Sequence, residues 1–321
     1  MLFLVLNMEE NVMKKKLNYF MYILIILFLL PYIVTVFING KDVNKERDVK
    51  NPYVTVTIKG KQKEVERSDY LAGLVVKEID PFYSEEAIKA QAVVTRTNLY
   101  RKNEYTEEYI TVEDMKKRWG ETKGGRIYKK IKNAVEETKG QVLMYDGKPI
   151  QASFHSLSNG KTRNADEAIK KSNYPYLTLK ECPKDLESGL QIQTLTLSYT
   201  EAKEYCAPIL KASSQEESKK QYQFEDFEIV SCDSAGYVLE VRIGDQIYAG
   251  EEIRQVLDLP SACFTFQDFE GNLKITTQGV GHGIGMSQYT AHQMAEEGKK
   301  YEEILQFFYE GTTINEVTEI L

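Results

Sequence analysis

An uncharged stretch near the N-terminus places the strongest limit on how this chain can fold. Residues Leu17 to Ile38 carry no charged side chain and consist mostly of leucine, isoleucine, phenylalanine and valine. A helix of roughly 20 apolar residues crosses the ~30 Å hydrocarbon core of a bilayer, so this stretch is long enough to span one. Three lysines, Lys14 to Lys16, precede it. Positive charges on this side keep the N-terminus cytoplasmic and place the rest of the chain outside.

A cleaved signal peptide is the alternative interpretation of the same stretch. The apolar run is longer than the usual signal-peptide core, and the residues after it match an A-x-A cleavage site poorly. We therefore expect a single-pass protein of the cell membrane with four parts. These are a cytoplasmic N-terminus (1–16), a transmembrane anchor (17–38), a tether (39–52) and an extracytoplasmic domain (53–321).

The charge of the part beyond the anchor limits its ligands. The first forty residues carry three lysines and two glutamates, so the remainder has a net charge of −8, against −7 for the whole chain. Binding of nucleic acid depends on cationic groups that neutralise phosphates, so nucleic acid is not an expected partner. An anionic ligand would have to be held by local hydrogen bonds rather than by a broad positive field.

All four cysteines lie beyond the predicted anchor, where disulfides can persist: Cys182, Cys206, Cys232 and Cys263. Four cysteines allow three pairings, which sequence cannot distinguish. We favour sequential pairing, 182 with 206 and 232 with 263, and free buried thiols are the alternative. Zinc is not expected, because no two cysteines have the close spacing of a structural site.

The pattern along the chain favours an α+β fold, with mixed helices and antiparallel strands around a substrate cleft, because no regular βαβ alternation appears. Strands are expected at 53–58, 141–145, 150–155, 227–232, 238–243 and 273–277, and those at 141–145 and 150–155 are expected to pair as a β-hairpin around Asp146-Gly147. Helices are expected at 68–78 with Ser68 as N-cap, at 84–101, at 287–297 and at 301–309. The charged segment 109–139 has a helical pattern, with Gly120 and Gly124-Gly125 as breaks. The region 180–220 shows no clear pattern.

Glu78 closes the apolar face of the first of these helices. Leu71, Leu74 and Val75 precede it by seven, four and three residues, so all four side chains share one helical face. A partly desolvated carboxyl group favours its neutral form and can donate a proton near neutral pH. The alternative is a solvated or ion-paired carboxylate at a helix end.

The next helix combines small and polar residues. Its alanines indicate close packing of the backbone, while Gln91, Arg96 and Thr97 are polar side chains on the same helix. These three are candidates for substrate binding. The alternative is that they are buried and form hydrogen bonds with loop carbonyls.

A polar turn follows the strand that ends at residue 155. His155, Ser156, Ser158 and Asn159 can offer hydroxyl, ring and amide hydrogen bonds to a sugar. A structural turn is the alternative. A serine–histidine nucleophilic pair needs a third orienting group and an oxyanion site, and neighbours in sequence rarely satisfy that geometry.

A glycine-rich segment, Gly279 to Gly285, lies between an expected strand and an expected helix. It lacks the Lys-Ser/Thr of a phosphate loop, so nucleotide binding is weakly supported. Alternate glycines let the backbone approach a ligand or another strand closely. His282 within it, and Ser287, Gln288 and Tyr289 at the start of the helix, are further candidates for ligand binding.

These segments together resemble the stage II sporulation protein D family, lytic transglycosylases of the bacterial cell wall that share motifs with amidase enhancers. The matching segments are Tyr70–Pro81 with Glu86–Thr97, then Phe154–Thr162 with Tyr174–Leu177, and finally Gly279–Tyr289 with Gly311–Ile314. The resemblance covers about residues 53–315, and its three parts occur in the same order as in the family.

The resemblance implies that Glu78 is the catalytic acid of a membrane-anchored enzyme. Such an enzyme cleaves the bond between N-acetylmuramic acid and N-acetylglucosamine in peptide-stripped glycan strands, forms a 1,6-anhydro product and needs no cofactor. It acts in wall remodelling during sporulation and engulfment, together with a cell-wall amidase and a further membrane protein.

The chain also departs from the family pattern. Ile79-Asp80-Pro81 inserts one residue after the glutamate, where the family has Met-Pro. A non-catalytic wall-binding scaffold or amidase enhancer is therefore the alternative. Some clostridial members bind zinc near the middle motif, but Ser156 stands where a cysteine would, so no metal is expected.

Overall fold

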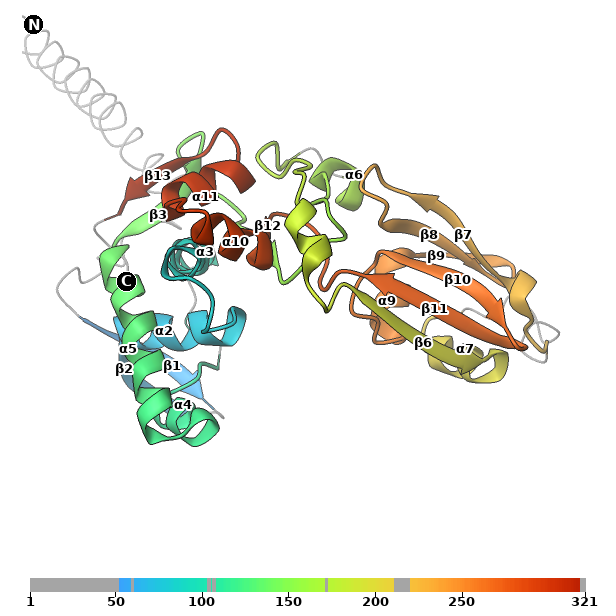
Figure 1. Ribbon diagram of the computed structural model, residues 1–321, viewed down its shortest axis with the longest axis horizontal. Helices are drawn as coiled ribbons and strands as arrows, with labels where there is room; N and C mark the ends of the chain where they lie inside the picture. The colour runs from blue at the N-terminus through green and yellow to red at the C-terminus, as the bar shows by residue number, and fades with distance from the viewer. Residues whose placement is uncertain are drawn as a thin grey trace, which may run out of the picture. The chain divides into compact units, whose positions relative to one another are not determined.

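The computed structural model describes residues 52–58, 61–102, 105, 108–170, 173–210 and 220–317. Figure 1 shows how the elements are arranged. The expected anchor at 17–38 lies outside the described residues. In the part that is described, none of the helices combines the length and the apolar character that crossing a bilayer requires.

The helices and strands alternate irregularly along the chain. The helices are α2 (Arg67–Glu78), α3 (Glu85–Lys102), α4 (Val112–Trp119), α5 (Glu121–Glu137), α6 (Ala165–Ile169), α7 (Tyr199–Cys206), α9 (Gly250–Val256), α10 (Gln288–Glu296) and α11 (Tyr301–Phe308), with 3₁₀ turns η1 (Pro183–Glu187) and η2 (Phe224–Asp226). The strands are β1 (Tyr53–Ile58), β2 (Lys61–Glu66), β3 (Gln141–Tyr145), β4 (Lys148–Pro149), β5 (Phe154–His155), β6 (Ile192–Ser198), β7 (Phe227–Cys232), β8 (Val238–Ile243), β9 (Gln246–Ala249), β10 (Phe264–Phe269), β11 (Asn272–Gln278), β12 (Met286–Ser287) and β13 (Thr313–Glu316).

A first hydrophobic cluster joins α2 to α3, α4, α5 and the β1–β2 hairpin. The helix α2 begins at Arg67, one residue before the expected start, and the hydroxyl of Ser68 donates to the Glu66 carboxylate instead of capping the helix. The expected break at Gly120 is confirmed, because this residue has φ 85° and separates α4 from α5. The break expected at Gly124-Gly125 is wrong. Gly124 lies inside α5, where the absence of a side chain lets α4 pack closely against it.

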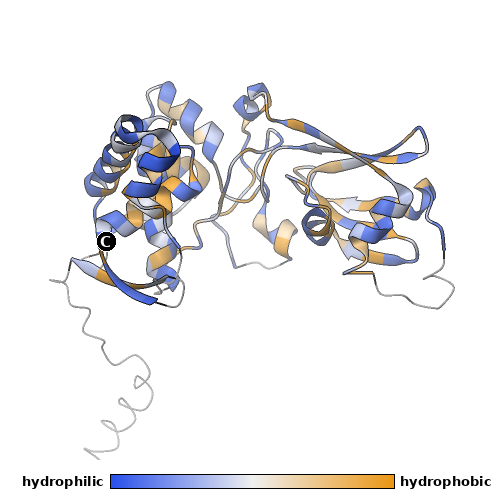
Figure 2. Ribbon diagram, turned by 90° about the horizontal axis from the view of Figure 1, so that it is seen from below, coloured by the Kyte–Doolittle hydropathy of each residue, from blue (hydrophilic) through white to orange (hydrophobic). Residues whose placement is uncertain are grey.

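A second cluster covers the other side of α3. Small residues of this helix, among them Ala87 and Ala90, pack with β3, α10 and α11. Beside them lies the sheet β13–β3–β4, whose pairs are antiparallel. The helix α3 is therefore buried on two sides, which explains its small and polar composition. In Figure 2, hydrophobic residues of this helical part gather between the helices and hydrophilic residues cover their outer faces.

A third cluster is built from two antiparallel three-stranded sheets, β10–β11–β6 and β7–β8–β9. The helices α7 and α9 pack with them around one core. The expected strands at 227–232, 238–243 and 273–277 are confirmed. The strand β6 and the helix α7 occupy the region 180–220, where the sequence showed no pattern. Together the three clusters confirm the α+β class with antiparallel sheets.

The expected hairpin at 141–155 is only partly present. Its turn and the short strand β4 form, but β5 leaves the hairpin and pairs in parallel with β12. This pairing places Phe154 opposite Met286 and His155 opposite Ser287. The middle motif and the glycine-rich segment thus lie side by side.

The four cysteines are free thiols, so the expected sequential disulfide pairing is wrong. Cys182, Cys206 and Cys263 are buried, while Cys232 is exposed. Burial raises the pKa of the Cys182 and Cys206 thiols to about 12, which keeps both protonated at neutral pH.

Candidate active site

Glu78 is the last residue of α2, and its half-buried side chain is positioned by the way that helix ends. The next residue, Ile79, has extended backbone (φ −123°, ψ 153°), and its amide donates to the carbonyl of Val75 at 3.0 Å. The Ile79 side chain is buried in the first cluster. The residue inserted relative to the family pattern therefore forms part of an anchored helix end.

The carboxyl group of Glu78 is held by α3. The Gln91 side-chain amide donates to Glu78 Oε2 at 2.9 Å, and the Thr95 hydroxyl donates to the same oxygen. Gln288, at the start of α10, donates to the Glu78 carbonyl at 2.8 Å and to Gln91 Oε1 at 3.0 Å. The structure thus brings together residues from the first and third motifs that the sequence identified separately.

Glu78 lines two cavities of about 380 Å³ each. One is lined by Leu74, Glu78, Thr95, Asn98, Leu99, Arg101, Lys102, Gln151, Ala152, Ser153 and Phe154. The other is lined by Val76, Lys77, Glu78, Ile79, Asp80, Pro81, Phe82, Tyr83, Arg118, Trp119, Ser156 and Gln288. Both cavities therefore share Glu78 as a lining residue.

Arg96 and Thr97 are placed in the core, and a substrate-binding role for them is not supported by their positions. The Arg96 guanidinium is fully buried and donates to the carbonyls of Val135 at 2.9 Å and Gln141 at 3.2 Å. Burial lowers its pKa to about 9. The Thr97 hydroxyl donates to Val93 and accepts from the amide of Leu143. Both side chains tie α3 to its neighbours, as the alternative interpretation holds.

Ser158 and Ser287 surround a buried carboxylate that sequence analysis missed, that of Asp185 in η1. Asp185 Oδ2 accepts from the Ser158 amide at 2.8 Å, the Ser158 hydroxyl at 2.5 Å and the Ser287 hydroxyl at 2.7 Å. The hydroxyl of Thr290 donates to the other oxygen at 2.6 Å. The two serines therefore fix the junction of the middle motif with α10. Both hydroxyls donate to Asp185, so neither Ser158 nor Ser287 is paired with a histidine as a nucleophile would be.

His155 is buried and His282 is half-buried, and their ring centroids lie 6.0 Å apart. Burial lowers the pKa of His155 to about 3 and that of His282 to about 4, so both rings are neutral at pH 7. His155 Nδ1 lies 3.3 Å from the carbonyl oxygen of Ile284, and His282 Nδ1 accepts from the Ile284 amide at 3.1 Å. Neither ring lines the two cavities at Glu78.

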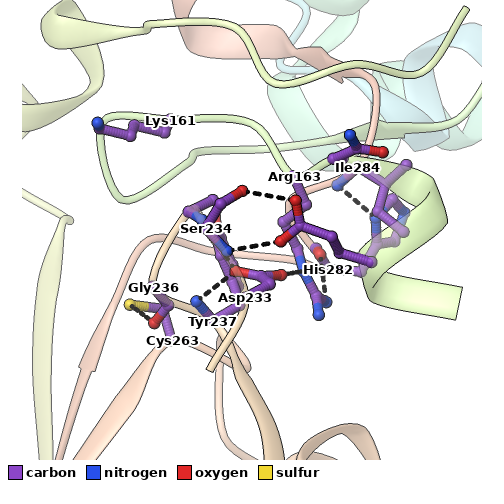
Figure 3. A network of polar contacts seen from close by, with 12 residues as sticks. Lys161, Arg163, Asp233, Ser234, Gly236, Tyr237, Cys263, His282 and Ile284 are labelled. Atoms are coloured by element: carbon purple, nitrogen blue, oxygen red, sulfur yellow. Dashed lines mark hydrogen bonds and ion pairs between the residues drawn. The ribbon is translucent and has the colours of Figure 1, made fainter. Parts of the chain in front are cut away.

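Figure 3 shows the polar contacts around Arg163 and Asp233, and Asn159 adds a further link from the middle motif to the segment between β7 and β8. Its side-chain amide donates to the carbonyl of Ala235 at 2.7 Å. The centre of the network is a buried ion pair in which Arg163 Nε donates to Asp233 Oδ2 at 2.6 Å. Arg163 also donates to the carbonyl of His282 at 3.2 Å. We assign Asn159 and His282 to this connection between the two motif loops and the sheets.

Ser156, Gln288 and Tyr289 remain candidates for ligand binding. Ser156 is exposed and lines the same cavity as Glu78 and Gln288. The Tyr289 amide donates to the carbonyl of Ser156 at 3.1 Å, and its ring packs edge-on against Tyr83. These residues place the polar turn and the start of α10 at one wall of the cavity.

Two groups near Glu78 escaped sequence analysis. Thr95 lies one helical turn after Gln91, so the i, i+4 spacing could have identified it as a second donor to the same carboxyl group. Asn98, one turn beyond Thr95 in the same cavity, forms two hydrogen bonds with the backbone of Ala152. No local pattern marks that long-range contact.

Comparisons with known proteins decide the family. A family model described as "Stage II sporulation protein" matches residues 58–145, the segment that contains Glu78, Gln91 and Thr95. Stage II sporulation protein D of Bacillus amyloliquefaciens is 34% identical over 79% of this chain and 75% of its own length. The chain belongs to the stage II sporulation protein D family. The Bacillus subtilis (strain 168) member is 33% identical over the same shares.

The chain is also similar to a protein that carries a different name. A protein named amidase enhancer, from Bacillus subtilis (strain 168), is 28% identical over 76% of this chain but only 40% of its own length. The resemblance stated from the three motifs is therefore confirmed at the level of the family.

Proposed function

We propose that this protein is a peptidoglycan lytic transglycosylase that acts through Glu78. The observation that carries the proposal is the position of this carboxyl group. It belongs to a residue that lines two cavities, and neutral donors from Gln91 and Thr95 hold one of its oxygens. A fixed, half-buried carboxyl group beside an open groove suits proton transfer to a bound glycan.

The proposed reaction needs one carboxyl group. Glu78 donates its proton to the glycosidic oxygen, and the bond between that oxygen and C1 of N-acetylmuramic acid breaks. An oxocarbenium-like centre develops at C1, as in related glycoside chemistry. The C6 hydroxyl oxygen of the same sugar then bonds to C1, and its proton passes to Glu78. The nucleophile is intramolecular and already close, so no second carboxylate and no added water are required.

The biological setting is proposed from the family. The membrane anchor at 17–38 would hold the domain at the outer face of the cell membrane, against the wall. There the protein would remodel peptide-stripped strands during sporulation and engulfment, together with a cell-wall amidase and a further membrane protein. The relative named amidase enhancer supports the link with an amidase.

A carboxyl-specific substitution tests the proposal. In Glu78→Gln the side chain keeps its size but cannot donate the proton, and we expect the 1,6-anhydro product from purified denuded glycan to disappear. Asp80→Asn is the matched control. Asp80 is another carboxylate in the same cavity, and asparagine keeps the oxygen that accepts from the Phe82 amide. Product formation should survive in this control.

The second candidate is a wall-binding protein that enhances an amidase without cleaving glycan, as the name of one relative suggests. It predicts that the wild-type protein binds glycan and releases no new chain ends, while Glu78→Gln leaves any amidase stimulation intact. Mass spectrometry of glycan incubated with the wild-type protein alone separates the two candidates.

A further inference from the structure

An exposed aromatic wall stands beside Glu78 and has no assigned role. Phe82 is 52% exposed. Its ring meets that of Trp119 edge-on, with centroids 6.4 Å apart and planes at 87°. Both residues line the cavity that contains Glu78. Trp119 is half-buried against the first cluster, so an exposed ring and a supported ring stand together beside Glu78, as on a ligand-binding surface.

The loop that carries Phe82 is held in place by a turn of its own and by a lysine of α5. Asp80 Oδ1 accepts from the Phe82 amide at 2.9 Å, which closes a tight turn after the buried Ile79. The Lys130 ammonium on α5 donates to the carbonyls of Pro81 and Tyr83. This turn directly follows Ile79. It fixes Phe82 in an exposed position before any ligand arrives, which reduces the entropy lost on binding.

Cations accompany both rings. The Arg118 guanidinium lies 4.9 Å from the centre of the Trp119 ring and lines the cavity, while the Lys123 ammonium lies 4.4 Å from the centre of the Phe82 ring. These charges lie on a chain with a formal net charge of −7. A local pair of cations at an aromatic wall suits a ligand that combines an apolar face with a carboxylate.

We propose that Phe82 and Trp119 form a sugar-stacking subsite next to the cleaved bond, and that Arg118 pairs with the lactyl carboxylate of N-acetylmuramic acid. A pyranose ring presents C–H groups on its faces, and these pack against an aromatic ring while its hydroxyls stay hydrated. The inference rests on the proposed function, because it takes glycan as the ligand of the groove. It adds the residues that bind the sugar and an explanation for discrimination between anionic and neutral strands.

The chain offers a direct probe of this subsite, because Trp119 is its single tryptophan. We would titrate the full-length Glu78→Gln protein with a peptide-free oligosaccharide of alternating N-acetylglucosamine and N-acetylmuramic acid, and follow tryptophan fluorescence. A saturable change is expected. Phe82→Ala should raise the dissociation constant about tenfold, as loss of a buried aromatic contact does. Phe269→Ala is the matched control, since Phe269 is 44% exposed on β10 with Lys274 over its ring, and it should change nothing.

A second ligand tests the role of Arg118. A chito-oligosaccharide of the same length lacks the lactyl carboxylate. The protein with both Phe82 and Arg118 intact should therefore bind it more weakly than the oligosaccharide that contains N-acetylmuramic acid. Arg118→Ala should remove this preference, whereas Phe82→Ala should weaken the binding of both ligands.

The outcomes separate this inference from the proposed function. If Glu78-dependent cleavage proceeds while fluorescence does not respond and Phe82→Ala equals Phe269→Ala, the stacking subsite is wrong and the enzyme proposal stands. If fluorescence responds but Glu78→Gln forms product like the wild type, the subsite stands and the proposed mechanism fails.

Discussion

The neighbouring histidines His155 and His282 predict a steep loss of stability in mild acid. Burial lowers the pKa of His155 to about 3 and that of His282 to about 4, whereas an unfolded chain has a histidine pKa of about 6.5. The folded pKa is the lower one, so the unfolded state binds protons first as pH falls. Stability is complete above pH ~6.5 and is lost progressively below it.

The expected loss in the free energy of unfolding follows from these pKa values. At pH 5 each unfolded histidine is almost fully protonated while each folded ring is still neutral. The loss is therefore about 1.4 kcal/mol for each of the roughly 1.5 pH units below the unfolded pKa, or about 2 kcal/mol per histidine. Together, the two histidines should lower the free energy of unfolding by about 4 kcal/mol between pH 7 and pH 5. Carboxylates add little in this window, because their unfolded pKa lies lower.

The change in the free energy of unfolding with pH can be measured by urea unfolding of the full-length chain, followed by far-ultraviolet circular dichroism at several pH values. The double variant His155→Gln/His282→Gln provides the comparison, with each protein referred to its own value at pH 7. The variant should lose about 4 kcal/mol less than the wild type on acidification to pH 5. Equal slopes in the two proteins would show that these rings are not buried and neutral, and would refute the placement of both motif loops.

Three other substitutions give expected outcomes. Asp185→Ala leaves three hydroxyl donors and an amide without their buried acceptor. It should lower the free energy of unfolding by about 3–5 kcal/mol in urea titrations, and a loss below about 1 kcal/mol would contradict the network. Gly285→Ala should be much more damaging than Gly147→Ala. Both positions have positive φ, but a Cβ at 285 would lie 1.9 Å from a backbone oxygen, while one at 147 meets nothing within 4 Å. Similar unfolding midpoints for the two would refute that close approach. Thr95→Val removes a donor to the Glu78 carboxylate while keeping the side-chain shape, so kcat on denuded glycan should fall about tenfold with little change in KM.

Local patterns were sufficient to predict the part of the site that lies on two consecutive helices. The apolar stripe that ends at Glu78 and the small residues of α3 are properties of sequence neighbours, and the structure packs these helices together around Gln91. The alternate glycines also predicted a close backbone approach correctly. Gly285 has φ 74° and lies against the segment that leads into β5.

Long-range contacts account for what the sequence did not show. Ser158 and Ser287 form polar sequence patterns typical of ligand-binding turns, but their partner is Asp185, which comes from a 3₁₀ turn in a region without any pattern. Arg96 looked available on a helix whose neighbours were unknown, and burial of α3 on both sides directs it to carbonyl groups instead. A polar residue in a sequence pattern does not reveal whether its partner is a ligand or the protein itself.

The inserted residue after Glu78 illustrates the same limit. From sequence it was a reason to doubt the direction of the carboxyl group. In the structure Ile79 is buried, and Asp80 closes a turn that leaves Glu78 within hydrogen-bonding distance of Gln91. The outcome depended on whether the core could accept an isoleucine at that point, which no local pattern reports.

The mass of the products that the purified wild-type chain releases from peptide-free glycan tests the central claim most directly. If Glu78 transfers the proton and the sugar's own C6 hydroxyl closes the ring, every new N-acetylmuramic end is one water lighter than a reducing end and resists borohydride reduction. These ends should be absent with Glu78→Gln. Reducible ends of full mass, or anhydro ends that persist in Glu78→Gln, would contradict the account.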